Sequence, residues 1–377
     1  MQIVRKRSTL AIVKETTSGV EKKATTANDF VPTLEDFSIT MNQEMTQRMF
    51  VNGRNLEAQP IPGVRGVEAT VPFELTTDKT YSELLTAALG ATREVSSDLN
   101  ITAADKESVT VSNADAAKVK VGDWVVIKPS SGTRYLYKQI KTIASGKLTF
   151  AGDEEASNIP TTSKVSKMNV YTLTDSGKRD TFTLGYYQNG KINCAGIGCI
   201  PATVAIENII AGSIPKINFT LQGTDWEERV ENAPATPNFD GRATPPVTRL
   251  ARAFVNEVEV EATEIGLTLN NTVAFPPEVK TDSGKAAPLI TGAEAMLTMK
   301  IKKDDASNKY FADWQAGTKQ DCGFYIPKGA NMVGITCKDA VLMTVSMEEA
   351  DGLEYWTAEF KVTAEAGSGD PLSISIA

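Results

Sequence analysis

Two stretches of the 377-residue chain repeat almost the same line. Residues 65–78 read RGVEATVPFELTTD, and residues 291–304 read TGAEAMLTMKIKKD. In each, a Gly is followed two positions on by Glu-Ala, then by alternating apolar and polar residues, and finally by an Asp. Alternation with a period of two predicts a β-strand with one packed face and one solvated face. A repeated strand of this kind predicts a fold built from two similar units.

Other segments correspond between the two halves in the same order. The aligned pairs are 37–42 (FSITMN) with 265–270 (IGLTLN), 65–78 with 291–304, in which Gly66 matches Gly292 and Glu68 matches Glu294, 196–199 (GIGC) with 334–337 (GITC), and 212–223 with 352–362. All β proteins share a period of two, so convergent alternation is the alternative explanation. Convergence does not supply matched Gly, Glu and Asp, and we therefore interpret the pattern as an internal duplication.

The spacing of these pairs indicates where the first copy is longer. The offset between aligned segments shrinks after residue 78, so extra residues lie between there and residue 196, most of them in 96–166. These contain short alternating strands separated by Ser-Gly turns, as in a small β-barrel or sandwich inserted at a loop. The predicted organisation is an N-terminal arm (1–30), a first module (31–95 and 167–223), an inserted small β domain (96–166), a Pro-rich linker (224–250) and a second module (251–377).

Strand patterns dominate the chain, and helical patterns are few. KTYSELLTAALGA at 79–91 and SNKYFADWQAG at 307–317 are the two candidates, and each ends in a Gly suited to stop a helix. We therefore predict a mainly β fold, with two tandem β-sandwich modules that each carry a short flanking helix, plus the small inserted all-β domain.

The composition argues against catalysis and metal binding. The chain has no histidine, which removes the side chain most used as a general base and metal ligand near neutral pH. Its cysteines (Cys194, Cys199, Cys322 and Cys337) match zinc-site spacing only loosely, so buried free thiols are favoured. The carboxylates near strand starts are not paired with a positioned base. We expect no catalytic residue, no cofactor and no metal, and hence no enzyme.

Charge and hydropathy address the binding partners. The formal net charge is −8, which disfavours tight nucleic-acid binding, because such affinity comes from Lys and Arg neutralising phosphates. No apolar run approaches the roughly 18 residues that a membrane helix needs. The N-terminus lacks the long apolar core of a signal peptide. We expect a chain without a membrane segment that stays in the cytoplasm of the cell that makes it.

The residues also resemble a known family. RKRSTLAIVKETTSGVEKKATTANDFVPTLEDFSIT, RGVEATVPFEL and YSELLTAALGA, with the later GIGCIPATVAIENIIAGSIPKINFTLQGTDW, resemble tail tube (major tail) proteins of long-tailed bacteriophages. The resemblance covers most of 1–230 and, through the repeat, more weakly 251–377. It implies β-sandwich modules whose hairpins join a ring of strands around a channel, and rings that stack into the tube through which the genome leaves.

The resemblance also implies partners and a location. Two modules per chain imply a homotrimer that closes a pseudo-hexameric ring, other tail proteins as partners, and DNA that passes without specific binding. The virion tail is the implied location, after synthesis in the host bacterial cytoplasm. We expect the repeated strand to provide the subunit interface through Gly66, Glu68, Phe73, Leu75, Gly292, Glu294, Leu297 and Ile301.

Two other classes of function stay open at this point. A monomeric multi-domain binding module, such as an adhesin or a carbohydrate binder, explains the repeat and the aromatic strands but not the missing secretion signal. A carboxylate-dependent hydrolase lacks any paired residues to perform the reaction.

Overall fold

The computed structural model describes residues 8–48, 58–77, 81–105, 107–129, 135–151, 162–237, 239, 243–246, 248–304, 309–350, 352–363 and 370–377. The chain is mainly β, with 60% of residues in strands and 8% in helices, as the sequence predicts. One sheet network has eighteen strands and a second has seven. Asp78, which ends the first repeated stretch, lies outside the described residues.

The elements of the first half are β1 (Thr9–Lys14), β2 (Phe30–Val31), β3 (Ser38–Arg48), β4 (Ala58–Glu74), α1 (Ser82–Leu89), β5 (Gly90–Val95), β6 (Leu99–Asn100), β7 (Ala103–Ala104), β8 (Ser108–Thr110), α2 (Asn113–Ala116), β9 (Trp124–Lys128), β10 (Leu136–Ala144), β11 (Lys147–Phe150), β12 (Lys164–Val165), β13 (Met168–Leu173), β14 (Phe182–Gln188), β15 (Ile192–Ile210), β16 (Lys216–Gly223) and β17 (Asp225–Val230).

The elements of the second half are β18 (Arg252–Val255), β19 (Val258–Val260), β20 (Ala262–Ala274), β21 (Leu289–Lys302), α3 (Lys309–Ala316), β22 (Lys319–Lys328), β23 (Asn331–Ala350), β24 (Leu353–Lys361) and β25 (Leu372–Ile376). Short 3-10 turns precede β2 and β18.

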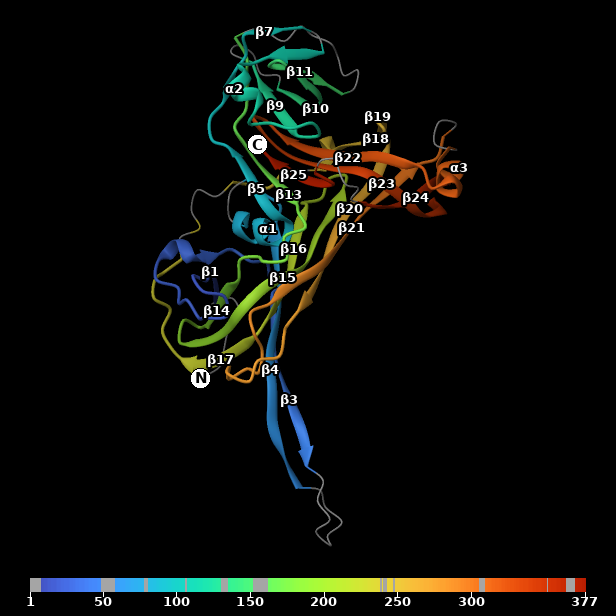
Figure 1. Cartoon of the computed structure of the whole chain (residues 1–377). Coiled ribbons are helices and arrows are strands. Elements are labelled where there is room, and N and C mark those ends of the chain that lie inside the picture. The colour runs from blue at the N-terminus through green and yellow to red at the C-terminus, as the bar shows by residue number, and fades with distance from the viewer. Residues whose placement is uncertain are drawn as a thin grey trace.

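A single antiparallel sheet runs through both halves. Its strand order is β3-β4-β16-β15-β20-β21-β24-β23, and the pairing of β15 with β20 joins the halves. Figure 1 shows the β3–β4 hairpin projecting from the body as a long arm, while β23 and β24 lie on another side of the molecule. We refer to these eight strands as the main sheet.

Two long strands leave the main sheet and enter a second layer. The first part of β15 pairs with β14 and β17, and β14 pairs with β1. In the second half, the first part of β23 pairs with β22 and β25, and β22 pairs with β18. The predicted N-terminal arm and Pro-rich linker are not wholly irregular, since residues 9–14 and 225–230 within them form paired strands. The C-terminal tail, β25, is likewise paired.

Between α1 and β14 the chain forms a small β unit, which we define as residues 99–165. Its sheet has the order β6-β12-β9-β10-β11-β8-β7 and packs around its own apolar cluster, which includes Val109, Val125 and Leu148. The flanking strands β5 and β13 pair with each other, and β13 also pairs with β25. Figure 1 shows this unit at one end of the molecule, beside β22 and β25.

The main core lies between the apolar face of the main sheet and a cover made of the second-layer strands and the helices, to which β14 contributes Phe182, β22 contributes Phe324 and α1 contributes Leu85. The alternation of side chains along each strand determines which residues enter this core. On β16 every second residue is buried, so Ile217, Phe219 and Leu221 are fully enclosed. Helix α1 ends as predicted at Gly90, whose φ of 102° favours glycine. Helix α3 is followed by Gly317 at a φ of 61°. In the part of the chain that the structure describes, no helix has the length and apolarity to cross a membrane.

Candidate assembly surfaces and the junction between the halves

At the junction of β15 with β20, polar residue pairs lie on one face of the sheet and apolar pairs on the other. On one face Thr203 lies opposite Asn270, and the Thr203 hydroxyl donates to Asn270 Oδ1 at 3.1 Å. On the other face Val204 lies opposite Leu269 and Ile206 opposite Leu267. All four of these apolar side chains are buried, and each such burial stabilises the joint by roughly 1.5–3 kcal/mol.

A buried amide strengthens the same joint. Asn271 Nδ2 donates to the backbone oxygens of Ala88 and Pro201, both at 3.1 Å. The Ala88 carbonyl belongs to the last turn of α1, where backbone acceptors lack partners within the helix. The second half therefore completes the hydrogen bonding of a helix end in the first half.

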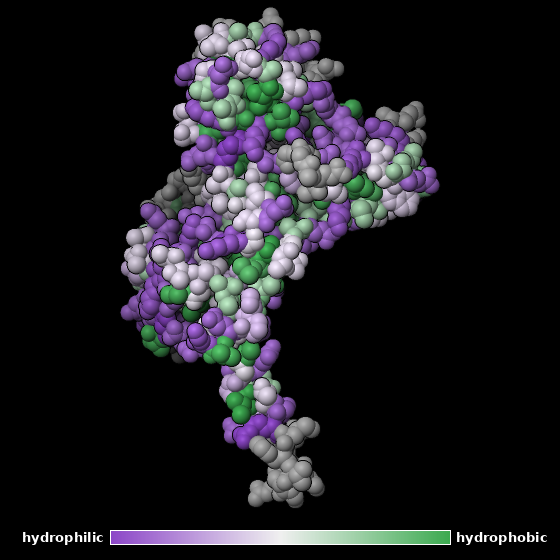
Figure 2. All heavy atoms as spheres, in the orientation of Figure 1, coloured by the Kyte–Doolittle hydropathy of each residue, from purple (hydrophilic) through white to green (hydrophobic). Residues whose placement is uncertain are grey.

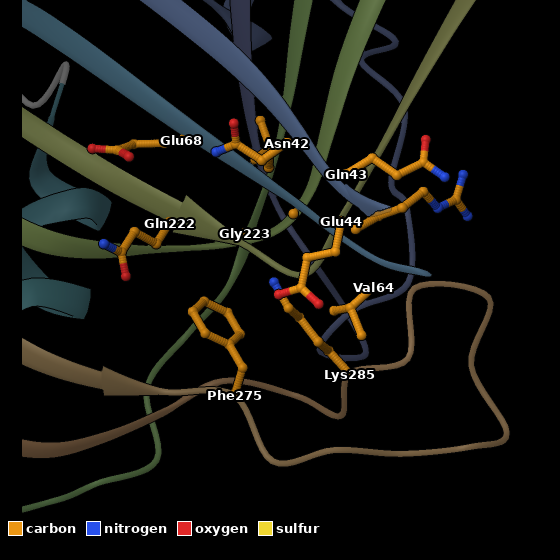
Figure 3. A pocket seen from close by; sticks show the side chains of 12 residues that line it. Asn42, Gln43, Glu44, Val64, Glu68, Gln222, Gly223, Phe275 and Lys285 are labelled. Carbon is orange, nitrogen blue, oxygen red and sulfur yellow. The ribbon is translucent and has the colours of Figure 1, made fainter. Parts of the chain in front are cut away.

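A cavity of about 350 Å³ opens where the loop between β20 and β21 meets the base of the β3–β4 hairpin. Figure 3 shows Lys285 from that loop directed toward the carboxylate of Glu44 of β3, while the Phe275 ring projects from the loop beside it. The Lys285 ammonium lies 4.9 Å from the Phe275 ring centroid. Burial lowers the pKa of Lys285, and the nearby carboxylates of Glu44 and Asp225 oppose that shift. The polar residues that line this cavity form a contact between the two halves of the chain.

Gly66 makes this contact possible. A Cβ at this position would lie 2.6 Å from Lys285 Nζ, so the lysine approaches β4 because no side chain is present. The neighbouring Arg65 donates its backbone N–H to the Ser283 oxygen at 3.2 Å, and its guanidinium pairs with Asp225 at 3.1 Å. The sequence singled out Gly66 for its repeat, whereas the structure places it at the junction inside one chain.

The residues predicted to form the subunit interface lie on interior strands, except Leu75, which directly follows β4. Strand β4 is paired on both sides by β3 and β16, and β21 by β20 and β24. The apolar members are buried in the core of the same chain: Phe73, Leu75, Leu297 and Ile301. The remaining members lie along the other face of these strands: Gly66, Glu68, Gly292 and Glu294. The structure does not bring the two groups together at one surface.

The open edges of the main sheet lie elsewhere. Among the described residues, β3 pairs with β4 alone, and residues 342–350 of β23 pair with β24 alone. The β3 edge is exposed along most of its length. On β23, Met343 is 48% exposed and Met347 is 57% exposed. Two backbone oxygens of these edges accept from indole N–H groups, Met343 from Trp314 at 2.8 Å and Asn42 from Trp226 at 3.2 Å. Neither edge carries a second strand among the described residues, so each is a surface on which another strand can add. Sequence periodicity could not find these edges, because it does not identify strand neighbours.

The cysteines are buried free thiols, as expected. Cys322 and Cys337 lie opposite each other on β22 and β23, and burial raises the pKa of Cys337 to about 12. Cys194 and Cys199 lie on β15. The described residues include no group of three or more His, Cys, Asp or Glu side chains placed to hold a metal ion.

These features, a sheet with two open edges and no centre of side-chain chemistry among the described residues, suit a protein that assembles. A family model described as phage tail tube protein matches residues 5–373, nearly the whole chain. The chain belongs to the phage tail tube family. A comparison with curated proteins gives no match. As a tail tube protein it is a structural component of a virion tail, and the family implies a role without catalysis.

Proposed function

We propose that this tail tube protein polymerises as stacked rings whose central channel delivers the phage genome. One observation carries the proposal: the main sheet runs unbroken through both halves and ends in an open edge on each side. A sheet with two open edges can grow by adding the edge of a second copy, and a closed ring removes both edges. Other tail proteins would then contact the ends of the stacked tube.

The second face of the main sheet suits a channel wall. Its charged side chains are the carboxylates Glu68, Glu74, Glu207, Glu264, Glu294, Glu348 and Glu359 and the lysines Lys216, Lys300, Lys302 and Lys361. Every lysine of this face pairs with a carboxylate, for example Lys300 with Glu348 at 2.7 Å and Lys361 with Glu294 at 2.5 Å. A net negative wall repels the DNA backbone, so a genome can pass without adhering.

The strand order supports two copies of one module in each chain. In the first half the order along the chain is β1, β2, β3, β4, α1, β14, β15, β16, β17, and in the second it is β18, β19, β20, β21, α3, β22, β23, β24, β25. The printed pairings join equivalent strands in both, for example β1 with β14 and β18 with β22. The small β unit with its flanking strands is the addition between α1 and β14.

Matching β-bulges support a correspondence between the halves that differs in part from the sequence alignment. The pairing of β15 with β16 skips one residue between Pro201 and Thr203, and that of β23 with β24 skips one between Leu342 and Thr344. A second bulge precedes each, and it contains Gly198 at a φ of 63° in β15 and Asp339 at 50° in β23. Gly198 therefore corresponds to Asp339. The bulges thus support a correspondence that lies three positions from the alignment of GIGC with GITC.

The same bulges correct the alignment of the repeated stretch that first suggested a duplication. Crossing the sheet from Thr203 through β16 leads to Thr70, and crossing from Thr344 through β24 leads to Thr298. Thr70 thus corresponds to Thr298, and Gly66 to Glu294 rather than to Gly292. The shift of two residues keeps every side chain on its face, which is why periodicity did not detect it.

Three copies of the chain would supply six modules, the number that the family resemblance implies for one ring. Negative-stain electron microscopy of the purified protein at high concentration tests the function. We expect rings or short tubes about 100 Å wide or less, from the roughly 10 Å thickness of packed sheets around a pore. A strictly monomeric protein at high concentration, by microscopy and by sedimentation, would overturn the proposal. Reproducible binding to a glycan array would instead favour an adhesin.

A further inference from the structure

We infer that β23 of one copy pairs with β3 of the next, and that the register is that of β15 with β20 inside the chain. The inference rests on the ring assembly proposed above and specifies its contact. The two strands end the main sheet on opposite sides, so their pairing joins different copies head to tail. The internal junction is a complete example of the same contact.

Positions on β23 follow from its bulge. Because Thr203 and Thr344 each follow the skipped residue, Val204 corresponds to Val345, Ala205 to Ser346 and Ile206 to Met347. The pairings beyond the bulge are regular in both strands over these residues. The transfer therefore covers a run of four positions.

Positions on β3 follow by crossing the sheet. The path from Thr203 through β16 and β4 ends at Ser38, and the path from Thr344 through β24 and β21 ends at Gly266. Ser38 therefore corresponds to Gly266. Four residues further along the same strands, Asn42 corresponds to Asn270.

The transferred register preserves the character of three of the four pairs. The internal pairs Thr203·Asn270, Val204·Leu269, Ala205·Thr268 and Ile206·Leu267 become Thr344·Asn42, Val345·Met41, Ser346·Thr40 and Met347·Ile39. The two apolar pairs stay apolar, the Thr·Asn pair recurs unchanged, and the mixed pair Ala205·Thr268 becomes the polar pair Ser346·Thr40. A register shifted by one residue would oppose polar to apolar side chains at each position.

The exposure of side chains on β23 fits a strand that lacks its partner in the single chain. Ile206 is fully buried at the internal junction, whereas Met347, in the same place on β23, is 57% exposed. Likewise Ala202 is 6% exposed and the corresponding Met343 is 48% exposed. The residue that corresponds to Asn271 is Gln43, another amide, which is exposed on β3. In the proposed contact, Gln43 would meet the last turn of α3 in the copy that supplies β23, as Asn271 meets the last turn of α1.

Paired cysteines test the register. In one variant Ser346→Cys is combined with Thr40→Cys, and in a second Val345→Cys is combined with Met41→Cys. Opposite residues alternate between close and wide spacing along an antiparallel pair, so one of the two variants has the close spacing that a disulfide needs. The control combines Ser346→Cys with Asn42→Cys, which keeps the face and shifts the register by two residues. The native cysteines are buried and contribute little background.

After mild oxidation of the full-length protein, denaturing gels without reductant should show covalent multimers for at least one matched variant. The shifted control should cross-link at least tenfold less, because diagonal neighbours are too far apart. Microscopy of the same reduced samples separates the two proposals. Rings with cross-linking only in the shifted control would overturn the register and leave the tube. Rings without cross-linking in any variant would overturn the β3–β23 contact. If the wild-type protein forms no rings and none of the cysteine variants cross-links, both proposals are overturned.

Discussion

The indole ring of Trp124 packs on the phenol ring of Tyr325, with the ring centroids 4.9 Å apart. Trp124 belongs to the small β unit and Tyr325 to β22 of the second half. The indole N–H also donates to the Ile335 oxygen at 3.2 Å, and Tyr325 stacks on Tyr137 of the small unit at 5.5 Å. Through these contacts the small unit packs against β22 and β23 in the second layer of the second half.

The first half covers the equivalent face in another way. In the duplication proposed above, Tyr187 on β14 corresponds to Tyr325, and Phe30 packs on Tyr187 at 5.7 Å between ring centroids. Phe30 is the first residue of β2, and Ala24 from the segment between β1 and β2 joins it in the same apolar cluster. In the second half, β18 and β19 are joined by Asn256 and Glu257 alone. The connection between β18 and β19 is too short to cover the aromatic face of β22 around Tyr325, and the small β unit covers this face instead. It is part of the structure of the second half rather than an independent attachment.

Trp124→Ala should destabilise the protein by about 3–5 kcal/mol, the usual cost of removing a buried Trp side chain. The indole is 3% exposed, so its loss leaves a cavity between the small unit and β22. Chemical denaturation followed by tyrosine and tryptophan fluorescence measures the change. Val121→Ala, at a 44% exposed position of the same unit, is the control and should change stability little. Equal stability of Trp124→Ala and wild type would show that the packing of the small unit on β22 does not stabilise the protein.

A second prediction concerns pH and the end of β17. Glu231 accepts hydrogen bonds from Arg229 at 2.6 Å, Asn193 at 3.1 Å and Lys23 at 3.0 Å. Burial acts to raise the pKa of Glu231, but these donors outweigh it and lower the pKa to about 2. A lowered carboxyl pKa stabilises the folded state above the ordinary value of 4.5, and this stabilisation is lost as pH falls toward 2.

In Glu231→Gln the stability should therefore depend less on pH between 4.5 and 2. At pH 6 the variant should be less stable than wild type by roughly 1–2 kcal/mol, since partial exposure screens the ion pairs, and near pH 2 the two should converge. Thermal unfolding followed by circular dichroism at both pH values gives the comparison. Glu228→Gln, at an exposed position of the same strand, is the control. A constant difference between variant and wild type at all pH values would contradict the proposed pKa.

Local sequence signals identified much of the fold, and non-local pairing decided the rest. Alternation located strands such as β16, and Gly90 located the end of α1, because each depends on a few neighbouring residues. Phe73 and Ile301 were assigned to a subunit interface because an apolar residue on an alternating strand looks the same toward a core or toward a partner. Only the pairing on both sides of β4 and β21 shows that these strands are not edges.

The last prediction compares two glycines at close contacts. A Cβ at Gly334 would lie 2.5 Å from Trp124 Cβ and Cγ, atoms that are fixed by packing. Gly334→Ala should force the small unit away from β23 and destabilise the protein by about 1–3 kcal/mol, as overpacking of a tight core does.

Gly66→Ala provides the contrast, because the atom in its way is the flexible end of Lys285. We expect a loss below about 1 kcal/mol, with the lysine displaced into the junction cavity. Denaturant midpoints of the two variants, measured side by side with wild type, give the comparison. If Gly66→Ala proved the more damaging, Lys285 would be held at β4 far more rigidly than its cation–π contact with Phe275 and its nearby carboxylates suggest. In that case the polar junction, rather than the apolar pairs of β15 and β20, would dominate the joint between the halves.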